Sequence, residues 1–308
     1  MVRILVSDRL DEEGLEILRR EGFEVDVKLN LPADQLREAV KDYDVLLVRG
    51  RTKVTREVLE ASDKLKLVVR AGIGLDNIDL EAARQRGVRV ENTPEAVSSA
   101  VAELTIALML AVARRLPEAD RTVKGGGWSK EKFLGLELRG KTLGIIGLGR
   151  IGCEVAKICR AMEMRVIFYD VVDRDEWAEK YGCEPVASLE KLLAEADIVS
   201  IHVPLTSSTY HMIGRRELSL MKPGAILINT SRGAIVDEQA LLEALKEGRL
   251  GGVGLDVYEE EPPKSRELLS LPNVVCTPHI GAQTKEAQKA ASIAAARKVI
   301  EFFRGGAG

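Results

Sequence analysis

The stretch that decides the fold of this chain is Lys141–Gly152, which reads KTLGIIGLGRIG. Its first half is a short apolar run, typical of a buried strand. Its second half places three glycines ahead of a segment without helix breakers, which is typical of a turn entering a helix. A second apolar run, Arg165–Tyr169, follows that helix and ends at Asp170. The order of strand, glycine turn, helix and strand predicts one βαβ unit of a parallel sheet.

The same alternation extends in both directions along the 308 residues. Short apolar runs and helical patterns alternate from Arg3–Val6 to Val88–Glu91, and again from Thr142–Ile146 to Val274–Cys276. We therefore predict an α/β fold with two doubly wound parallel-sheet domains, a Rossmann-type domain inserted in a flavodoxin-like one. The predicted domains are residues 1–96 with 284–308, and residues 97–283. The long helix from about Val97 and the last helix would be the crossovers between them.

Residues 116–140 interrupt this alternation. The segment contains Lys124-Gly125-Gly126-Gly127-Trp128 and shows little periodicity. An irregular stretch of this length inside a compact domain is uncommon and needs a reason. One reason is an arm that packs on a second copy of the chain, and the other is a disordered linker. Trp128, Phe133 and Leu134 favour burial, and so they favour the arm of a homodimer.

The composition is globular, with 45% hydrophobic residues, 30% charged residues and a formal net charge of −3. Charges of both signs are spread along the chain, so nothing favours nucleic acid or an anionic membrane as a partner. No apolar run reaches the ~18 residues that would span a bilayer, and the N-terminus becomes charged too early for a signal peptide. The four cysteines form no C-x-x-C pair, and the histidines are not clustered with them. We therefore expect no metal site and a reducing, cytoplasmic location.

The glycine turn has the G-x-G-x-x-G spacing of a dinucleotide-binding loop. Gly147 would permit the tight turn, Gly149 would let the backbone approach a pyrophosphate, and Gly152 would let the helix pack closely on the strand. The first N–H groups of the helix, at Arg150 and Ile151, would face the phosphates. The motif alone is weak, but the flanking strand and helix strengthen it.

Asp170 lies at the end of the next strand, close to the spacing of ~20 residues expected for the acidic residue of such a site. Its carboxylate would accept hydrogen bonds from the adenosine ribose hydroxyls and would repel a 2′-phosphate. The sequence therefore predicts NAD rather than NADP as cofactor, although Arg174 lies near enough to soften this preference. The alternative is an ordinary αβ turn with a solvated aspartate.

Three further residues each follow an apolar run and precede Gly or Pro: Arg232, Glu261 and His279. In an open parallel sheet such positions fall on loops at the carboxyl edge, where ligands bind. A cation can hold an anionic substrate, an imidazole can move a proton, and a carboxylate can stabilise the protonated imidazole. The sequence thus predicts a catalytic group for oxidation of a negatively charged alcohol. Glu259 and Glu260 are expected to be solvated neighbours.

The chain has two other histidines. His202 ends an apolar run near the expected cofactor crevice, but it has no acidic partner close in the sequence. His211 lies in a polar stretch and is expected on the surface. His279 is therefore the favoured acid–base residue.

Cations also end strands in the first domain, at Arg49 and at Arg70. Arg70 leads into a glycine turn whose backbone N–H groups, around Ile73 and Gly74, suit a carboxylate. Several cations for one small substrate indicate a dianion, such as a phosphorylated hydroxy acid. For the neighbouring Arg51, surface solubility is an equal alternative.

Together these motifs resemble the D-isomer-specific 2-hydroxyacid dehydrogenases over essentially the whole chain. The resemblance rests on five stretches, which are Arg70–Asn77, Gly147–Gly152, Asn229–Gly233, Leu255–Pro263 and Pro278–Ala282. Two positions, Ile73 and Gln283, depart from the family pattern, because hydroxyl residues are common there.

The resemblance implies roles for individual residues. Arg232 would hold the substrate carboxylate, Glu261 would support the histidine, and His279 would be the acid–base. Arg49 and Arg70 would meet the substrate, and the arm near Trp128 would pair two subunits. The implied NAD contacts are Arg150, Ile151, Asp170, Val203, Thr230, Ser231, Arg232, Asp256, His279, Gly281 and Ala282.

The reaction implied by the resemblance is NAD-dependent oxidation of 3-phospho-D-glycerate to 3-phosphohydroxypyruvate, the entry to serine biosynthesis. A close alternative is reduction of glyoxylate or hydroxypyruvate by the same catalytic residues. An alternative of another class is an NAD-sensing corepressor that binds the dinucleotide without turnover. Because the chain ends at Gly308, no C-terminal regulatory domain is expected.

Overall fold

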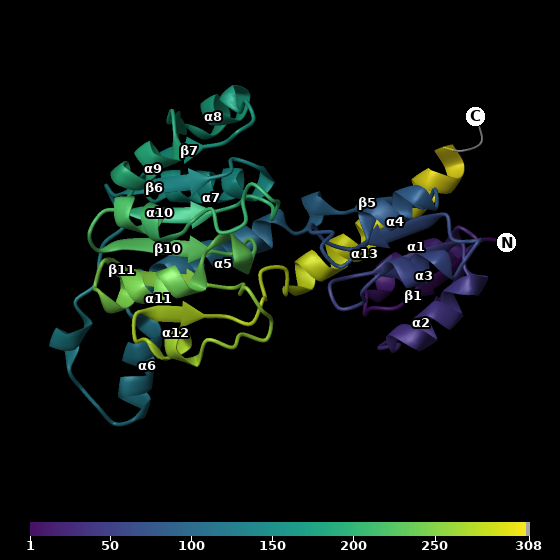
Figure 1. Cartoon of the computed structure of the whole chain (residues 1–308), viewed down its shortest axis with the longest axis horizontal. Coiled ribbons are helices and arrows are strands. Elements are labelled where there is room, and N and C mark those ends of the chain that lie inside the picture. The colour runs from purple at the N-terminus through teal and green to yellow at the C-terminus, as the bar shows by residue number, and fades with distance from the viewer. Residues whose placement is uncertain (306–308) are drawn as a thin grey trace. The chain divides into compact units, whose positions relative to one another are not determined.

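The structure, a computed structural model that describes residues 1–305, divides the chain into two compact units (Figure 1). Unit 1 comprises Met1–Ser98 and Ala282–Gly308, and unit 2 comprises Ser99–Gly281. The junctions fall at 98/99 and 281/282, beside the predicted junctions at 96/97 and 283/284. Each unit contains one wholly parallel sheet flanked by helices, so the predicted fold class is confirmed.

Unit 1 has five strands in the order β2-β1-β3-β4-β5, which is the order of flavodoxin-like sheets. The strands are β1 (Arg3–Val6), β2 (Glu24–Val27), β3 (Val45–Val48), β4 (Leu67–Arg70) and β5 (Arg89–Asn92). The helices are α1 (Glu12–Arg20), α2 (Ala33–Ala39), η1 (Val40–Asp42), α3 (Arg56–Glu60), α4 (Leu80–Gln85), η2 (Pro94–Ala96) and α13 (Lys285–Gly305).

The central strands of unit 1 are buried on both faces, as expected for a parallel sheet. Leu5, Leu46 and Val68 pack with α2, α3 and α4 in one core. Helix α13 contacts β4 and packs along α1. The approach of these two helices is so close that a Cβ on Gly14 would lie 2.3 Å from Oγ of Ser292. This packing joins the last helix of the chain to its first unit.

Unit 2 has seven strands in the order β12-β11-β10-β9-β6-β7-β8, the Rossmann order with one added strand. The strands are β6 (Thr142–Ile146), β7 (Arg165–Tyr169), β8 (Glu184–Pro185), β9 (Ile198–Ile201), β10 (Ala225–Asn229), β11 (Leu250–Leu255) and β12 (Val274–Cys276). The helices are α5 (Ser98–Ala113), α6 (Leu116–Lys124), η3 (Lys130–Phe133), α7 (Arg150–Ala161), α8 (Asp175–Tyr181), α9 (Leu189–Glu195), α10 (Arg215–Leu220), η4 (Gly233–Ile235), α11 (Glu238–Lys246) and α12 (Arg266–Ser270).

Side chains alternate between two cores along each central strand of unit 2. Ile145 on β6 packs with α5 and α7, whereas the next residue, Ile146, packs with the core formed by α9, α10 and α11. On β10, Ile226 and Ile228 belong to the first core and Leu227 to the second. The period of two fixes the register, because a slip by one residue would exchange the two faces.

Helix α5 buries one broad face in unit 2, including Ala102, Met109 and Ala113, while Ser99, Glu103 and Ala107 form an exposed stripe. It lies close over β11, where a Cβ on Gly252 would come within 2.6 Å of Val112 and one on Gly254 within 3.0 Å of Leu108. These glycines make room for the helix. Within residues 1–305, neither this helix nor any other combines the length and hydropathy required to cross a membrane.

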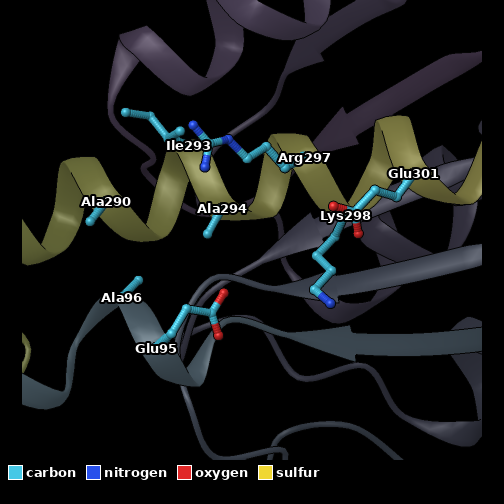
Figure 2. A pocket seen from close by; sticks show the side chains of 8 residues that line it. All are labelled: Glu95, Ala96, Ala290, Ile293, Ala294, Arg297, Lys298 and Glu301. Atoms are coloured by element: carbon cyan, nitrogen blue, oxygen red, sulfur yellow. The ribbon is translucent and has the colours of Figure 1, made fainter.

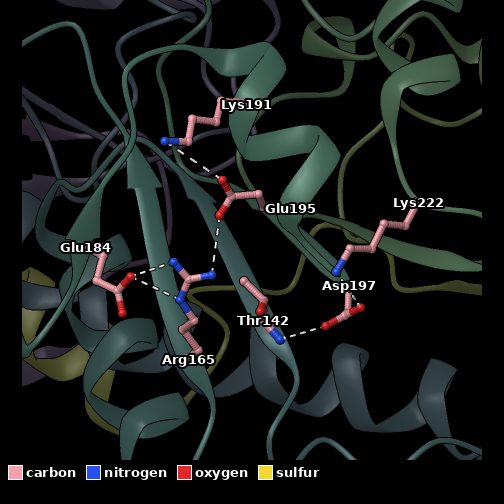
Figure 3. Close-up of polar contacts among 7 residues, drawn as sticks. All are labelled: Thr142, Arg165, Glu184, Lys191, Glu195, Asp197 and Lys222. Atoms are coloured by element: carbon pink, nitrogen blue, oxygen red, sulfur yellow. Dashed lines mark hydrogen bonds and ion pairs between the residues drawn. The ribbon is translucent and has the colours of Figure 1, made fainter.

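Charged side chains join the amino ends of the central strands, as Figure 3 shows. The Thr142 N–H at the start of β6 donates to Asp197 Oδ2 (2.8 Å), and Lys222 Nζ lies 3.0 Å from Oδ1 of the same residue. Burial would raise the pKa of Asp197, but the Thr142 N–H and the Lys222 charge lower it overall. Arg165 at the start of β7 pairs with Glu184 at 2.6 Å. Exposed pairs like this contribute only ~0.2–1 kcal/mol each, and they occupy the edge opposite the glycine turn.

Residues 116–140 differ from the predicted irregular arm. The segment begins with helix α6, whose Pro117 suits a first helical turn, and it continues with η3. Gly125 caps α6, and Gly126 takes a left-handed φ of 80°. The rest of this chain does not bury Trp128 or Leu134, whose exposed fractions are 87% and 89%, and their burial against a second copy stays a prediction.

Candidate active site

The glycine turn lies between β6 and α7, where the strand order reverses between β6 and β9. Gly147 has a φ of 91°, and a Cβ on it would lie 2.8 Å from the His202 carbonyl and 2.7 Å from Val203. A Cβ on Gly152 would lie 2.4 Å from the Gly147 carbonyl. A Cβ on Gly149 would meet nothing within 4 Å. Two glycines are thus required by packing, while the third leaves space beside the N-terminus of α7, as a bound pyrophosphate requires.

Asp170 follows β7 beside this turn, and its side chain is only 9% exposed. Its Oδ2 accepts a hydrogen bond from the Leu148 N–H (2.9 Å) and from Arg174 Nε (3.2 Å). Its Oδ1 accepts one from the Val172 N–H (3.0 Å). The Arg174 guanidinium also lies over the Trp177 ring, 5.1 Å from its centre. The Asp170 carboxylate therefore holds the backbone of the glycine turn, in addition to its predicted role toward a ribose. The sequence did not reveal the first of these roles.

Arg232 lies in the loop that follows β10, and Asn229 gives this loop its shape. Asn229 Oδ1 accepts from the Ser231 N–H (3.0 Å), and its Nδ2 donates to the Arg232 carbonyl (2.9 Å). Ser231 donates its hydroxyl to the Val203 carbonyl, so the loops after β9 and β10 are joined. Arg232 Nη1 donates to the Ser231 carbonyl (2.7 Å).

Glu261 and His279 follow β11 and β12, and their side chains meet. His279 Nδ1 lies 2.7 Å from Glu261 Oε2, and the two side chains are 48% and 40% exposed. Burial would raise the pKa of Glu261. The hydrogen bond and charge of His279, the Tyr258 N–H and the charge of Arg232 together lower it below its ordinary value. With Nδ1–H bound to the carboxylate, the neutral ring carries its lone pair on Nε2.

Asp256 was predicted to contact the cofactor, and its carboxylate holds the His279 loop. Oδ1 accepts from the Ile280 N–H (2.8 Å) and the Thr277 hydroxyl (2.6 Å), while Oδ2 accepts from the Gly281 N–H (2.8 Å). His279 has a φ of 53°, a left-handed conformation that costs a non-glycine residue ~1–2 kcal/mol. The three hydrogen bonds to Asp256 stabilise this conformation and so direct the imidazole.

His202 does not suit proton transfer. Burial lowers its pKa to about 3, so the ring stays neutral at physiological pH. Its Nε2 lies 2.8 Å from Oγ of Ser200 on the same strand. These observations favour His279 over His202 as the acid–base residue.

Three predicted cofactor residues, Thr230, Gly281 and Ala282, lie at the borders of this group. The buried Thr230 hydroxyl lies 2.9 Å from that of Thr105 on α5. Gly281 fits tightly, since a Cβ there would lie 3.2 Å from Asp256 Oδ2. Ala282 is the first residue of the second segment of unit 1.

Unit 1 carries its own cations at the carboxyl edge of its sheet. Arg49 follows β3 and Arg70 ends the neighbouring strand β4. Asp8 accepts the Arg49 backbone N–H (2.6 Å), and burial lowers the pKa of the Arg49 side chain despite the Asp8 charge. Gly72 has a φ of 149°, a backbone conformation that favours glycine, which explains part of this motif.

The loop that carries Ile73 and Gly74 is held by polar side chains of the next strand. Asn92 Nδ2 donates to the Ile73 carbonyl (2.5 Å), and the Gly72 N–H donates to the Thr93 hydroxyl (2.9 Å). Sequence reasoning missed both partners, because neither belongs to a recognisable motif.

A groove between η2 and α13 is a second candidate site in unit 1 (Figure 2). Alanine side chains and Ile293 line it, together with four charged residues, Glu95, Arg297, Lys298 and Glu301. Two carboxylates balance its two cations, so the groove suits a dianion poorly. None of the predicted site residues is among the residues that line this groove within the described part of the chain.

Known proteins with similar sequences and structures identify the family of this chain. A sequence model of the D-isomer specific 2-hydroxyacid dehydrogenase NAD binding domain matches residues 106–281. The chain is 51% identical, over 305 residues, to D-3-phosphoglycerate dehydrogenase of Methanocaldococcus jannaschii, covering 99% of this chain and 58% of that protein. It is 45% identical, over 313 residues, to glyoxylate reductase of Thermococcus litoralis, covering 98% and 94%. The solved structure of D-lactate dehydrogenase from Aquifex aeolicus, complexed with NAD and lactic acid, matches with a TM-score of 0.85 and 32% identity, covering 98% and 96%.

The chain therefore belongs to the D-isomer specific 2-hydroxyacid dehydrogenases, a family of NAD-dependent oxidoreductases. The family resemblance and the NAD cofactor predicted from the sequence are confirmed. The chain spans about three fifths of the length of the phosphoglycerate dehydrogenases that it matches, 58% for the archaeal one named above.

Proposed function

We propose that the protein oxidises 3-phospho-D-glycerate to 3-phosphohydroxypyruvate with NAD, at the entry to serine biosynthesis. The observation that carries the chemistry is the 2.7 Å contact between His279 Nδ1 and Glu261 Oε2. It lies on loops that follow neighbouring strands, one strand from the loop of Arg232. These are the parts that oxidation of an anionic alcohol requires.

Each side chain has one task in the proposed reaction. Bound NAD supplies the acceptor for the hydride. Arg232 holds the substrate carboxylate through charge-assisted hydrogen bonds. Neutral His279 takes the hydroxyl proton at Nε2 while Glu261 stabilises the imidazolium that forms, and in the reverse direction the same ring returns the proton. General acid–base help of this kind contributes roughly 10²–10⁴ in rate.

We assign cofactor binding to residues 97–283 and substrate selection to residues 1–96 with 284–308. Arg49 and Arg70, at the ends of neighbouring strands, supply the positive charge for the substrate phosphate. The names of relatives such as the archaeal phosphoglycerate dehydrogenase support this choice of substrate.

Reduction of glyoxylate or hydroxypyruvate is the second candidate. It is favoured by one observation, that the chain covers 94% of the Thermococcus litoralis glyoxylate reductase. The same Arg232, Glu261 and His279 would serve this reaction, and only the demand for a phosphate site differs.

Steady-state kinetics with 3-phosphoglycerate, glyoxylate and hydroxypyruvate, each with NAD(H) and NADP(H), separate the candidates. Arg49→Ala should remove one charge-assisted contact to the substrate phosphate, which contributes ~1.5–3 kcal/mol. This variant should therefore lower kcat/KM for 3-phosphoglycerate about 10- to 100-fold and leave glyoxylate reduction intact. Arg56→Ala, which removes an exposed arginine of α3, is the matched control. Equal losses on both substrates would refute the phosphate assignment, and absence of turnover on all three would refute the proposed reactions.

We also propose that residues 116–140 pair two copies of the chain. Four large apolar residues of this segment are at least half exposed: Leu116 at 51%, Val123 at 56%, Trp128 at 87% and Leu134 at 89%. Exposed apolar side chains concentrated in one segment mark interaction surfaces. Sedimentation should give a dimer for the wild type and a monomer for the double variant Trp128→Ser, Leu134→Ser. A variant that remains dimeric would place the interface elsewhere.

The cysteines support our proposal of a cytoplasmic location. All four are unpaired, and burial raises the pKa of Cys153 and Cys159 to about 12. Thiols without disulfides fit a reducing compartment. Cell fractionation with an antibody to the chain tests the location.

A further inference from the structure

Glu259 is bound to the start of helix α11, although its sequence suggests a solvated charge. The Glu259 N–H donates to Glu238 Oε1 (2.8 Å), and the Glu238 N–H donates to Glu259 Oε1 (2.9 Å). Each carboxylate therefore accepts the backbone N–H of the other residue. Burial raises the pKa of Glu238, and the charge of Glu259 adds to this, against the opposing effect of the hydrogen bond. The pair fixes the loop after β11 to a rigid helix.

His211 lies against the same carboxylate. Its Nε2 is 3.0 Å from Glu259 Oε1, and its Nδ1 is 4.0 Å from Asp237 Oδ2. The contact is short, but Nε2 makes no hydrogen bond in it. The ring also stacks on Tyr210 with 4.1 Å between ring centres. The expectation that His211 is an ordinary surface residue does not account for these contacts.

His211, Glu238 and Glu259 adjoin the loops that carry Arg232 and Glu261. The backbone N–H of His211 donates to the Ala234 carbonyl (2.8 Å), in the turn that follows Arg232. A Cβ on Gly233 of that turn would lie 1.8 Å from the Tyr258 carbonyl carbon, so the turn abuts the Tyr258–Glu259 peptide directly. The Tyr258 N–H in turn lies 3.4 Å from Glu261 Oε1.

The backbone that carries Glu261 is held in place by these contacts. The Glu261 side chain is 40% exposed; it pairs with His279, accepts from the Tyr258 N–H at 3.4 Å and feels the charge of Arg232. The backbone of residues 258–261 sets where this carboxylate starts and so helps to direct it at His279. That backbone is fixed on one side by the tight approach of Gly233 and on the other by the Glu238–Glu259 pair.

We propose that His211, Glu238 and Glu259 form a positioning cluster that holds Glu261 against His279 and so sets which ring nitrogen of His279 carries the proton. The proposal deepens the function proposed above and rests on it for its catalytic consequence. These three are positioning residues, since they act on the reaction through Glu261.

Glu238→Ala in the full chain tests the cluster, because it removes the acceptor for the Glu259 N–H. The chain has only three histidines, so nitrogen-15 spectra of labelled imidazoles can follow each ring, with His279→Asn giving the assignment. In the wild type at alkaline pH we expect the neutral His279 ring to carry its proton on Nδ1. In Glu238→Ala the Nε2–H form should gain population, as it does in a free imidazole. His211→Ala should act in the same direction and serves if Glu238→Ala does not fold.

Kinetics give the second readout. Glu238→Ala and His211→Ala should each lower kcat/KM for keto-acid reduction. The loss should not exceed the factor of about 5 to 30 that is expected for removing the Glu261 charge itself. The Kd of NADH should stay unchanged. Glu238→Gln keeps an oxygen acceptor and should restore both the ring signal and the rate. Glu260→Ala is the matched control, because Glu260 belongs to the same run but pairs with the exposed Lys264.

A folded Glu238→Ala or His211→Ala protein with the wild-type His279 ring signal would overturn the proposal, whatever its rate. So would a Glu260→Ala protein that changes the ring signal equally. The ring measurement needs no substrate. If the protein turned over none of the 2-hydroxy acids, the proposed reaction would be refuted. The nitrogen-15 signal of His279 would still test the positioning cluster.

Discussion

Replacing Glu261 by glutamine removes one negative charge beside His279 and keeps the size and an acceptor oxygen. The interacting atoms are 2.7 Å apart, and the side chains are 40% and 48% exposed. Two unit charges at that distance attract by ~1.5 kcal/mol in bulk water and more strongly at a lower effective dielectric. Exposure keeps the value near the lower limit. We expect a loss of ~1–2 kcal/mol of transition-state stabilisation, which is about 5- to 30-fold in kcat/KM.

The assay compares kcat/KM in both directions at neutral pH, with 3-phosphoglycerate and NAD and with 3-phosphohydroxypyruvate and NADH. A substitution cannot change the overall equilibrium, so both directions should fall by the same factor at a given pH. Thermal unfolding establishes that the variant is folded, and quenching of protein fluorescence gives the Kd of NADH, which we expect to stay constant.

Glu260→Gln provides the matched comparison, because it removes the same charge from the adjacent residue, whose side chain is 57% exposed. If Glu261→Gln loses less than about twofold, or no more than Glu260→Gln, the carboxylate does not act on the ring as argued. A loss beyond about a thousandfold would also refute the reasoning, since one half-exposed charge cannot supply ~4 kcal/mol.

Three further predictions concern pH, cofactor and packing. The pKa of Glu261 is lowered in the folded chain, so its contribution to stability should be complete above the unfolded value of about 4.3 and lost as pH falls further; the Tm difference between wild type and Glu261→Gln should vanish in that range. Asp170→Ala removes the ribose acceptor and frees Arg174 for a 2′-phosphate, so kcat/KM with NADH should fall about 10- to 100-fold while that with NADPH rises; unchanged preference would contradict this site. Gly233→Ala sets a Cβ 1.8 Å from the Tyr258 carbonyl carbon, and such overpacking should cost ~3 kcal/mol and lower Tm by about 6–12 °C in a melting experiment.

The place of the site could be predicted because parallel strands have a fixed polarity. Arg232, Glu261 and His279 each follow an apolar run, so each had to lie at a carboxyl edge. That their strands, β10, β11 and β12, are neighbours is a matter of sheet order, which no local pattern carries. The contact between Glu261 and His279 depends on that order.

The roles of the surrounding carboxylates could not be predicted, because they depend on distant partners. Glu259, Glu260 and Glu261 look alike in the sequence. In the structure their partners are Glu238, Lys264 and His279 respectively. Two of these partners lie 18 and 21 positions away along the chain.

Helix α6 was missed for a local reason. Its nine residues carry only a short apolar stripe, Leu116, Ala119 and Val123, and none of the nine is buried. The three glycines that follow, Gly125, Gly126 and Gly127, made the whole segment read as irregular. Trp128 is 87% exposed in the single chain, so its expected burial depends on a second copy, which no local pattern describes.

The hydrophobic cores of the two units are closed separately, each built from its own strands and helices. The proposed redox machinery belongs to one core, and the Arg49 and Arg70 loops belong to the other. Under the proposed assignment, substitutions around Arg49 and Arg70 change the phosphate site and leave the Glu261–His279 pair unchanged, while Arg232 keeps its hold on the carboxylate that the substrates share. Related proteins could then differ in substrate while they keep the same acid–base pair. Relatives named as phosphoglycerate dehydrogenase, glyoxylate reductase and hydroxypyruvate reductase accord with this expectation.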